Sequence, residues 1–294
     1  MLLLCLVMMN FTIAQALVEA AQMLRRAGIA EARRDAGVML AHLIGRDQPF
    51  LIAHAERELG AAEVARYRAA VERRAAGEPL QYITGHQEFF NLDFTVTPDV
   101  LIPRPDTELL VETALELADA NDERQAVCDV GTGTGCIIIS ILHERQQMRG
   151  VATDISQAAL KVAARNAAQH GVASRLSLVA TDCFEALSQS GVKFGLIVSN
   201  PPYVTEAAMP HLQREVREHE PRVALTPGGD GLSVIRRLLS ESPNFLDAGG
   251  HLLMEIGYDQ HEAVREMIDA QVWTLLDIHK DIQGIPRTVA LRKN

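Results

Sequence analysis

Four consecutive residues, Asn200-Pro201-Pro202-Tyr203, have the composition of a binding corner for a planar amino group. They follow the apolar run Phe194 to Ser199, which is typical of a buried strand, and two prolines prevent that strand from continuing. Prolines lack backbone N–H groups but keep their carbonyls, so the corner is rigid and rich in acceptors. A planar NH2 group, as in glutamine, adenine or guanine, offers two donors, which the Asn200 side-chain oxygen and the Pro201 carbonyl are able to accept.

Such a corner would prepare a nitrogen for reaction with an electrophile. The two hydrogen bonds would orient its π face and weaken its delocalisation, and Tyr203 would stack on the planar group. The position is suitable, because ligands of open α/β sheets bind at the carboxyl ends of the strands. The alternative is an ordinary turn that ends a strand, since Asn-Pro is a common turn signal.

A second candidate site is the glycine-rich turn Gly131-Thr132-Gly133-Thr134-Gly135. It lies between a predicted strand, Ala126 to Val130, and a predicted helix that begins at Cys136. A ligand can approach the backbone of such a turn closely and meet the N–H groups of the helix N-terminus. Asp154 ends the next predicted strand, where a carboxylate suits ribose hydroxyls. A nucleoside-containing ligand is implied.

The pattern of charged residues distinguishes between two nucleoside-containing ligands, NAD and S-adenosylmethionine. The dinucleotide fingerprint requires glycine where this chain has Cys136, and Asp129 places a carboxylate that would repel a pyrophosphate and attract a cation. S-adenosylmethionine carries an ammonium group and a sulfonium but no phosphate, so it is favoured over NAD. Asp182 and Cys183 follow the third strand, where a side chain would bond the adenine amino group; a surface turn is the alternative.

The composition describes a globular chain long enough for two domains. Its 294 residues are 48% hydrophobic and 4% aromatic, as is ordinary for an α/β protein. With 28 basic and 38 acidic residues the net charge is −10, which disfavours nucleic acid as a partner. No metal site is expected, because the four cysteines form no CxxC pair and have no histidine at metal spacing. They indicate core packing in a reducing compartment: Cys5, Cys128, Cys136 and Cys183.

The first residues are apolar but lack the basic region and cleavage site of a leader. Met8 and Met9 directly precede Asn10-Phe11-Thr12, where Thr12 would cap a helix from Ile13. Translation starting there would make residues 1–8 an annotation artefact, and otherwise they would be a loose tail. No stretch has the length and apolar character to span a bilayer, and the cytoplasm is the expected location.

The chain divides into three predicted segments. Residues 1–78 contain a helical bundle with breaks at Gly28, near Gly45 and at Gly60. Residues 79–105 connect the domains through a hairpin around Asn91-Leu92-Asp93. Residues 106–294 alternate strands and helices, which predicts a doubly wound, mostly parallel sheet of about seven strands. The expected strands are 126–130, 150–153, 176–180, 194–199, 251–256, 273–278 and 288–291.

Arg104 lies between two prolines in Ile102-Pro103-Arg104-Pro105-Asp106-Thr107-Glu108. The prolines fix an extended segment, and Asp106 or Thr107 would cap the helix Glu108 to Leu117. The arginine would place a positive charge at a site, and a plain helix-entry loop is the alternative.

These motifs together resemble the peptide chain release factor N5-glutamine methyltransferase family, which methylates the side-chain amide of the glutamine in the Gly-Gly-Gln motif of release factors. Asn-Pro-Pro-Tyr alone is shared with methyltransferases that act on amino groups of DNA, RNA and proteins, and the Ile102 to Glu108 segment with the preceding hairpin narrows the resemblance to glutamine. The resemblance extends over the chain through Pro79 to Gly85 with Glu88-Phe89, Ile102 to Glu108, Asp129 to Gly135, Asn200 to Tyr203, Glu220-Pro221 with Ala224-Leu225, Gly229 to Leu232, and Glu255 to Gly257.

The resemblance implies an α/β fold: a class I, Rossmann-like methyltransferase domain with an N-terminal helical domain that docks the release factor. It implies S-adenosylmethionine as cofactor and release factors as partners of a monomeric enzyme. Cofactor-binding residues would be Asp129, Gly131, Thr132, Gly133, Thr134, Gly135, Asp154, Asp182, Cys183 and Asn200, and substrate-binding residues Asn200, Pro201, Pro202, Tyr203 and Arg104. The family often has an aromatic residue at the position of Cys183, so Phe184 is a second candidate for the adenine pocket.

The expected reaction is direct in-line transfer of the methyl group to the glutamine nitrogen, with catalysis mainly from positioning by Asn200 to Tyr203. Alternatives are a methyltransferase for a ribosomal-protein glutamine or for an exocyclic amino group of nucleic acid, and a non-catalytic module that binds the ribosome or a release factor. An NAD-linked oxidoreductase is the least favoured alternative.

Overall fold

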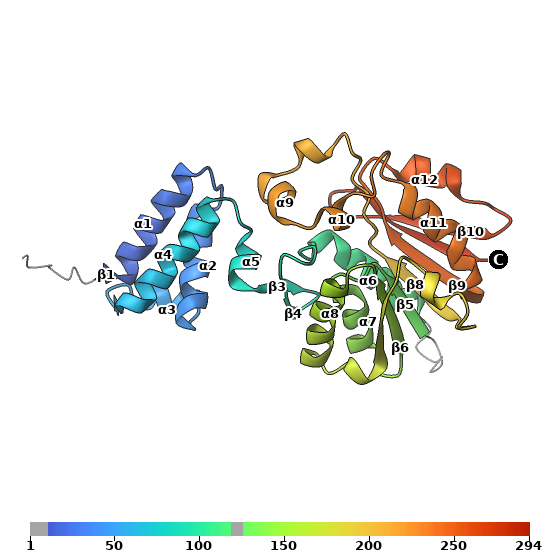
Figure 1. The fold of residues 1–294 in the computed structure, drawn as a ribbon, viewed down its shortest axis with the longest axis horizontal. Coiled ribbons are helices and arrows are strands. Elements are labelled where there is room, and N and C mark those ends of the chain that lie inside the picture. The colour runs from blue at the N-terminus through green and yellow to red at the C-terminus, as the bar shows by residue number, and fades with distance from the viewer. Residues whose placement is uncertain (1–10, 119–125) are drawn as a thin grey trace, which may run out of the picture. The chain divides into compact units, whose positions relative to one another are not determined.

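The computed structural model describes residues 11–118 and 126–294, in two compact units (Figure 1). One unit consists of the chain up to Gly85 together with Arg214–His219, and the other of His86–Gln213 and Glu220–Asn294. The prediction for residues 1–8 lies outside the described residues. The three predicted segments, 1–78, 79–105 and 106–294, stay a prediction.

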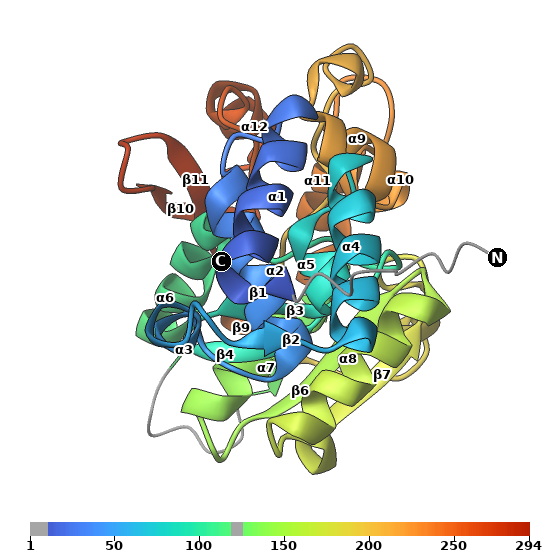
Figure 2. The same cartoon turned by 90° about the vertical axis from the view of Figure 1, so that its left-hand side faces the viewer.

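The first unit is a helical bundle whose helices α1, α2 and α4 pack on one another (Figure 2). Thr12 caps α1 as predicted, since its hydroxyl accepts from the Gln15 amide while the Gln15 side chain accepts from the Thr12 amide. Its elements are β1 Phe11–Thr12, α1 Ile13–Arg26, α2 Ala32–Ile44, α3 Gln48–Ala53, β2 Glu58–Leu59, α4 Ala61–Ala75 and α5 Leu80–Thr84.

A short helix from much later in the chain, α9 Arg214–His219, completes this unit. Arg74 of α4 explains part of its placement. The guanidinium is buried, with its Nε 2.8 Å from Asp35 Oδ2 and its Nη1 2.6 Å from Glu215 Oε2 of α9. A buried charge requires such partners, so the two carboxylates hold Arg74 between α2 and α9.

The second unit is built on a seven-stranded sheet of order β10-β11-β9-β8-β5-β6-β7. Strands β9, β8, β5, β6 and β7 run parallel, and β11 pairs antiparallel with both β9 and β10. The predicted doubly wound sheet is therefore confirmed. Its strands are β5 Ala126–Val130, β6 Arg149–Asp154, β7 Leu176–Ala180, β8 Phe194–Ser199, β9 Leu246–Glu255, β10 Trp273–Lys280 and β11 Pro286–Lys293.

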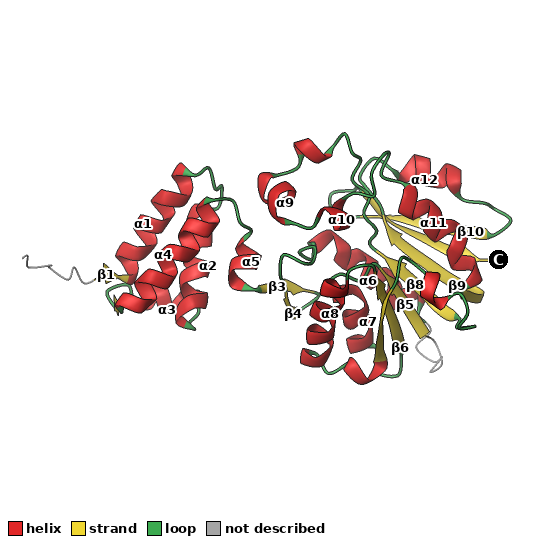
Figure 3. Ribbon diagram, in the orientation of Figure 1, coloured by secondary structure: helices red, strands yellow, loops and turns green. Residues whose placement is uncertain are grey.

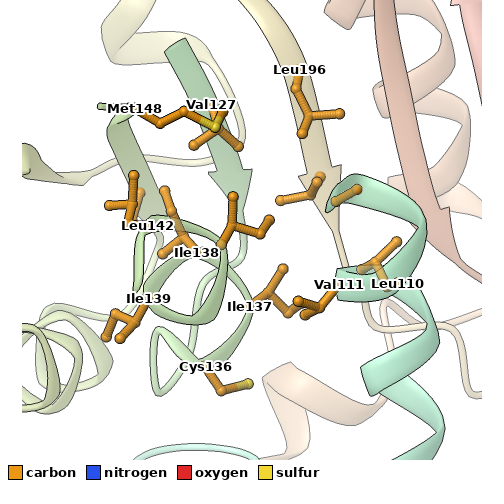
Figure 4. Packing of buried hydrophobic residues seen from close by; sticks show 14 of the residues in the cluster. Leu110, Val111, Val127, Cys136, Ile137, Ile138, Ile139, Leu142, Met148 and Leu196 are labelled. Carbon is orange, nitrogen blue, oxygen red and sulfur yellow. The ribbon is translucent and has the colours of Figure 1, made fainter. Parts of the chain in front are cut away.

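Helices cover both faces of this sheet (Figure 3). Because successive strand residues point to opposite faces, Val127 packs under α6 and α7 while Cys128 packs toward α11. Figure 4 shows α6 and α7 contributing apolar side chains around Val127 and Leu196. The main helices are α6 Glu108–Leu117, α7 Cys136–Glu144, α8 Gln157–Gln169, α10 Arg222–Leu225, α11 Ser233–Glu241 and α12 His261–Met267.

Two local predictions were wrong. The hairpin consists of β3 His86–Phe89 and β4 Leu92–Thr95, so its turn is at Phe90 and Asn91, both with positive φ, and not at Asn91 to Asp93. Helix α6 begins as predicted, but neither expected cap forms: the Thr107 hydroxyl donates to Glu255, and Asp106 pairs with Arg287.

Candidate active site

A cavity of about 490 Å³ opens at the carboxyl ends of four adjacent parallel strands of the second unit. The chain leaves β5 toward β6 on one side and returns through β8 on the other, so this edge is the topological switch point of the sheet. Each predicted motif follows one of these strands. The cavity is lined by Gly131 to Thr134 after β5, Asp154 at the end of β6, Asp182 and Cys183 after β7, and Asn200 to Pro202 after β8, with Arg104 and Thr107 from the segment before α6.

The glycine-rich turn is held open by its own conformation. Gly131, Gly133 and Gly135 all have positive φ, between 55° and 80°. Space around Gly131 and Gly133 is free, whereas a Cβ on Gly135 would lie 2.7 Å from Ile139 Cδ1. The first two glycines therefore leave the cavity side accessible, and Gly135, which does not line the cavity, allows α7 to pack closely.

Asp129 lies beneath the turn, fully buried and outside the cavity lining. Its Oδ2 accepts a 2.7 Å hydrogen bond from the Thr132 hydroxyl, and its Oδ1 has no hydrogen-bond partner among the residues that the structure describes. Burial raises the pKa of this carboxyl to about 7, against the lowering effect of Thr132. The turn thus covers a carboxylate that is poorly satisfied, which suits a cation bound above Thr132.

Asp154 closes the other side of the turn. Its Oδ2 accepts from the Gly133 amide at 2.9 Å and its Oδ1 from the Ser156 amide at 2.8 Å. Burial raises the pKa of this carboxyl, and the two amides counteract that effect. Ser156 also caps α8, since its hydroxyl accepts from the Ala159 amide. The carboxylate is thereby fixed at the cavity wall.

Asn166 of α8 is a buried residue that supports the turn and was missed from the sequence. Its Nδ2 donates to the carbonyls of Thr134, at 2.9 Å, and Thr95, at 3.1 Å, and its Oδ1 accepts from the Thr95 amide. The Asn166 side chain therefore joins strand β4 of the hairpin to the glycine-rich turn. A lone asparagine in an amphipathic helix gave no signal of this function.

The β7 end contributes Cys183 to the cavity, and Phe184 does not line it. Phe184 is buried and stacks on Phe245, with ring centroids 4.7 Å apart. Asp182 Oδ1 accepts from Arg237 Nη1 at 2.7 Å, and both side chains line the cavity. Cys183 rather than Phe184 therefore lines the cavity, and its contact with adenine stays a prediction. Arg237, which was not assigned a function from the sequence, orients Asp182.

The predicted corner follows β8 directly. β8 ends at Ser199, and Asn200, Pro201 and Pro202 line the cavity. Asn200 Nδ2 donates to Thr107 Oγ1 at 3.1 Å, which leaves its side-chain oxygen available as an acceptor. The amide acceptor and the proline carbonyls thus occur together at the cavity wall.

Tyr203 differs from the other corner residues because it does not line the cavity. Its hydroxyl donates to buried Glu255 at 3.0 Å, and burial beside that carboxylate raises its pKa. Its backbone carbonyl accepts from Gln260 Nε2 at 3.0 Å. Stacking of this ring on a planar substrate stays a prediction, and its observed contacts anchor the corner to β9 and the loop after it.

Arg104 reaches the cavity wall from the segment before α6. It pairs with Glu220, whose side chain is 1% exposed and whose other oxygen accepts from the Ile102 amide. Glu220 therefore fixes both the backbone and the charge of this segment. Neither Glu220 nor Glu255 was assigned a function from the sequence, although a glutamate in the apolar run His251 to Ile256 is the kind of signal that would have found Glu255.

Gly231 packs against the backbone of the corner at Tyr203. Its φ is +78°, and a Cβ there would lie 2.3 Å from the Tyr203 carbonyl oxygen. We expect Gly231→Ala to lower the free energy of unfolding by roughly 2–4 kcal/mol and to lower turnover, because backbone must move and the residue is strained. Gly228→Ala is the matched control, since φ is +83° there but no atom lies within 4 Å of the added Cβ. Equal losses in thermal unfolding and turnover for the two variants would contradict this account.

Two further observations concern the described residues as a whole. Within residues 11–118 and 126–294, no group of three or more His, Cys, Asp or Glu side chains is arranged to hold a metal ion. No helix in the same two ranges combines the length and hydrophobicity that a bilayer span requires.

Comparison with known proteins identifies the two parts of the chain. The family model of the PrmC N-terminal domain matches residues 15–85, and that of the Methyltransferase small domain matches residues 105–246. A methyltransferase from Pyrococcus furiosus superposes with a TM-score of 0.50 at 15% identity, covering 80% of this chain and all of that one. This likeness supports the class I methyltransferase fold.

Relatives that match most of the chain have a higher sequence identity than this solved structure. The release factor glutamine methyltransferase of Moorella thermoacetica is 46% identical over 88% of this chain and 90% of the relative. That of Koribacter versatilis is 43% identical over 96% of this chain and 99% of the relative. The chain therefore belongs to the release factor glutamine methyltransferase family.

Proposed function

We propose that this protein transfers a methyl group from S-adenosylmethionine to the side-chain amide nitrogen of the glutamine in the Gly-Gly-Gln motif of peptide chain release factors. The observation that carries the proposal is the corner at Asn200 to Pro202, an amide acceptor beside proline carbonyls on the wall of the cavity that the glycine-rich turn also lines. Relatives named for this activity match nearly the whole chain.

The residues around the turn fit the proposed cofactor. Asp129 has a buried oxygen beneath Thr132 with no hydrogen-bond partner in residues 11–118 and 126–294, and its charge favours the ammonium group of the cofactor. The Asp154 carboxylate lines the cavity, where it would accept hydrogen bonds from ribose hydroxyls, and Asp182 and Cys183 would hold the adenine. When bound, S-adenosylmethionine supplies an electrophilic methyl group.

The corner would act on the acceptor glutamine by positioning. The Asn200 oxygen and the Pro201 carbonyl accept from the two amide hydrogens, so the nitrogen is held with its π face toward the methyl group. Methylation makes the nitrogen cationic, after which it loses a proton readily, so no strong base is required beforehand. Orientation of this kind can supply several kcal/mol, about 7–11 at the ideal limit.

We assign the remaining functions on the same basis. The N-terminal helical domain, residues 1–78, would dock the release factor, and Arg104 would contact the substrate near the corner. The enzyme would be a cytoplasmic monomer without direct binding to nucleic acid, consistent with its net charge of −10. Size-exclusion chromatography with light scattering tests the monomer.

The decisive experiment is transfer of labelled methyl from S-adenosylmethionine to a purified release factor. A release factor with the Gly-Gly-Gln glutamine changed to alanine is the control. We expect label on the intact factor alone. Label on neither, with the cofactor bound, would refute the proposed acceptor and direct the search to ribosomal proteins and to amino groups of nucleic acid.

A further inference from the structure

Three hydrogen-bonded side chains, of which Glu255 and Thr107 are buried, connect β9 to the corner at Asn200. Glu255, at the end of β9 and 2% exposed, accepts on Oε2 from the Thr107 hydroxyl at 2.7 Å. The Thr107 oxygen in turn accepts from Asn200 Nδ2 at 3.1 Å. The other Glu255 oxygen accepts from the Tyr203 hydroxyl. One carboxylate therefore reaches both ends of the Asn200 to Tyr203 corner.

The chemistry of these groups gives the chain a direction. Burial raises the pKa of Glu255, whereas the Thr107 and Tyr203 hydroxyls and the charge of Arg287 act to lower it. In its ionised form Glu255 only accepts hydrogen bonds, and the hydroxyl hydrogen of Thr107 is directed to its Oε2. Toward Asn200, Thr107 then offers only lone pairs. The Asn200 amide must present its NH2 end to Thr107, because the opposite orientation would bring two oxygens together with no hydrogen between them.

The orientation of this amide decides which group the substrate meets. With its nitrogen on Thr107, Asn200 keeps its oxygen for the cavity, where an incoming NH2 group needs an acceptor. With the amide reversed, the substrate NH2 would face another NH2 group. Asparagine by itself has no preference between these two states, since its two ends are nearly equal in shape.

We propose that Glu255, acting through Thr107, is a positioning residue that holds the Asn200 amide with its oxygen toward the acceptor glutamine. The inference deepens the proposed function and rests on it. Thr107, although it lines the cavity, acts here through Asn200.

Two substitutions of Thr107 distinguish a function of its hydroxyl group from a function of its methyl group in packing. Valine keeps the shape of threonine and removes the hydroxyl, whereas serine keeps the hydroxyl and removes the methyl group. If the hydroxyl directs Asn200, we expect Thr107→Val to lower kcat/KM for the release factor about 10- to 100-fold and Thr107→Ser to stay within about threefold of the parent. A packing function predicts the reverse order, and either that order or equal activities would overturn the proposal.

Glu255→Gln is the second variant and decides the matter if Thr107→Val does not fold. Glutamine offers one acceptor and one NH2 group to two hydroxyls that both donate to the parent carboxylate, so the direction of the chain is no longer fixed. We expect turnover to fall at least about tenfold while S-adenosylmethionine binds as before. Parent-like turnover of Glu255→Gln would refute the proposal.

The outcomes also separate this inference from the proposed function. Thermal unfolding and a cofactor titration show that each variant is folded. If the parent enzyme transfers no methyl group to the release factor, the proposed function fails. If the parent is active and Thr107→Val equals Thr107→Ser, only the inference about Glu255 fails.

Discussion

Asn200→Ala is expected to lower kcat/KM for release factor methylation by about 10²–10³-fold, the usual loss when one preorganised polar group of an active site is removed. The substitution removes the amide oxygen that we propose accepts from the glutamine. It also leaves the Thr107 oxygen without its Asn200 donor. Methyl transfer from labelled cofactor under single-turnover conditions measures the effect on the chemical step.

The same variant should bind S-adenosylmethionine within about threefold of the parent, because the turn after β5 and Asp154 are untouched. Asn244→Ala is a matched loss of an asparagine amide, at an exposed residue of the short 3-10 helix before β9. It should be as active as the parent. If cofactor binding collapsed in Asn200→Ala while residual turnover stayed high, the assignment of Asn200 to the acceptor would be wrong.

The order and type of the sheet elements could be predicted because their signals are local. The bounds of β5, β7 and β8 agree with the predicted runs, where apolar residues end at a glycine turn, a polar turn or a proline pair. β9 begins at Leu246, five residues before its predicted start at His251. Gly249 and Gly250 precede His251 and are typical of a turn. In the strand they lie at an irregularity of the pairing with β8, between the pairs Phe194–Leu246 and Leu196–His251.

The placement of α9 was beyond local reasoning. Nothing in residues 214–219 indicates that they pack with helices more than a hundred positions earlier. The reason is the buried guanidinium of Arg74, which needs both Asp35 and Glu215. A salt bridge between distant residues has no periodicity or composition that a single sequence would reveal.

In the candidate site, too, local signals could be predicted from the sequence, whereas contacts between distant residues could not. Residues at strand ends were found because the fold brings those ends together, which places Gly131 to Thr134, Asp154 and Asn200 on one cavity. The sequence did not reveal functions of side chains that depend on a hydrogen-bond partner far away in the chain. The position of Thr107 just before α6 is typical of a helix cap. Its hydroxyl, however, donates to the buried carboxylate of Glu255, 148 positions later in the chain.

Buried polar side chains are what join the separate segments of this site. Asn166 ties the hairpin to the glycine-rich turn, Glu220 ties the Arg104 segment to the chain before α10, and Glu255 ties the corner to Thr107. Each of these groups is nearly inaccessible to solvent. Since an unpaired buried polar group is costly, such bonds fix geometry more firmly than apolar contacts of similar size.

Asp129→Asn is expected to weaken S-adenosylmethionine binding and, at the same time, to stabilise the cofactor-free protein above pH 7. The charge of Asp129 acts on the bound ammonium across Thr132, and its loss should raise the dissociation constant about 10- to 100-fold. Isothermal titration at pH 8 measures this part. An unchanged dissociation constant would exclude the carboxylate from cofactor binding.

The stability effect follows from the direction of the pKa. Burial raises the pKa of Asp129 from its ordinary value of 3.8 to about 7, so the folded protein binds this proton more tightly than the unfolded chain. The resulting contribution to stability is fully present below pH 3.8 and is lost as the pH rises through 7. Above pH 7 the parent holds a buried carboxylate, one oxygen of which lacks a hydrogen-bond partner in the described part of the chain. Asparagine removes that charge, and its amide can still bond Thr132.

We therefore expect the free energy of unfolding of Asp129→Asn to exceed that of the parent by about 1–3 kcal/mol at pH 8, with the difference shrinking as the pH falls below 7. Saturating S-adenosylmethionine should narrow or reverse the order, because the ligand stabilises the parent more strongly. Urea unfolding from pH 5.5 to pH 8.5, with and without cofactor, tests both statements. A stability difference that did not vary with pH would show that Asp129 does not titrate between pH 5.5 and pH 8.5 and would contradict a pKa near 7 for this carboxyl.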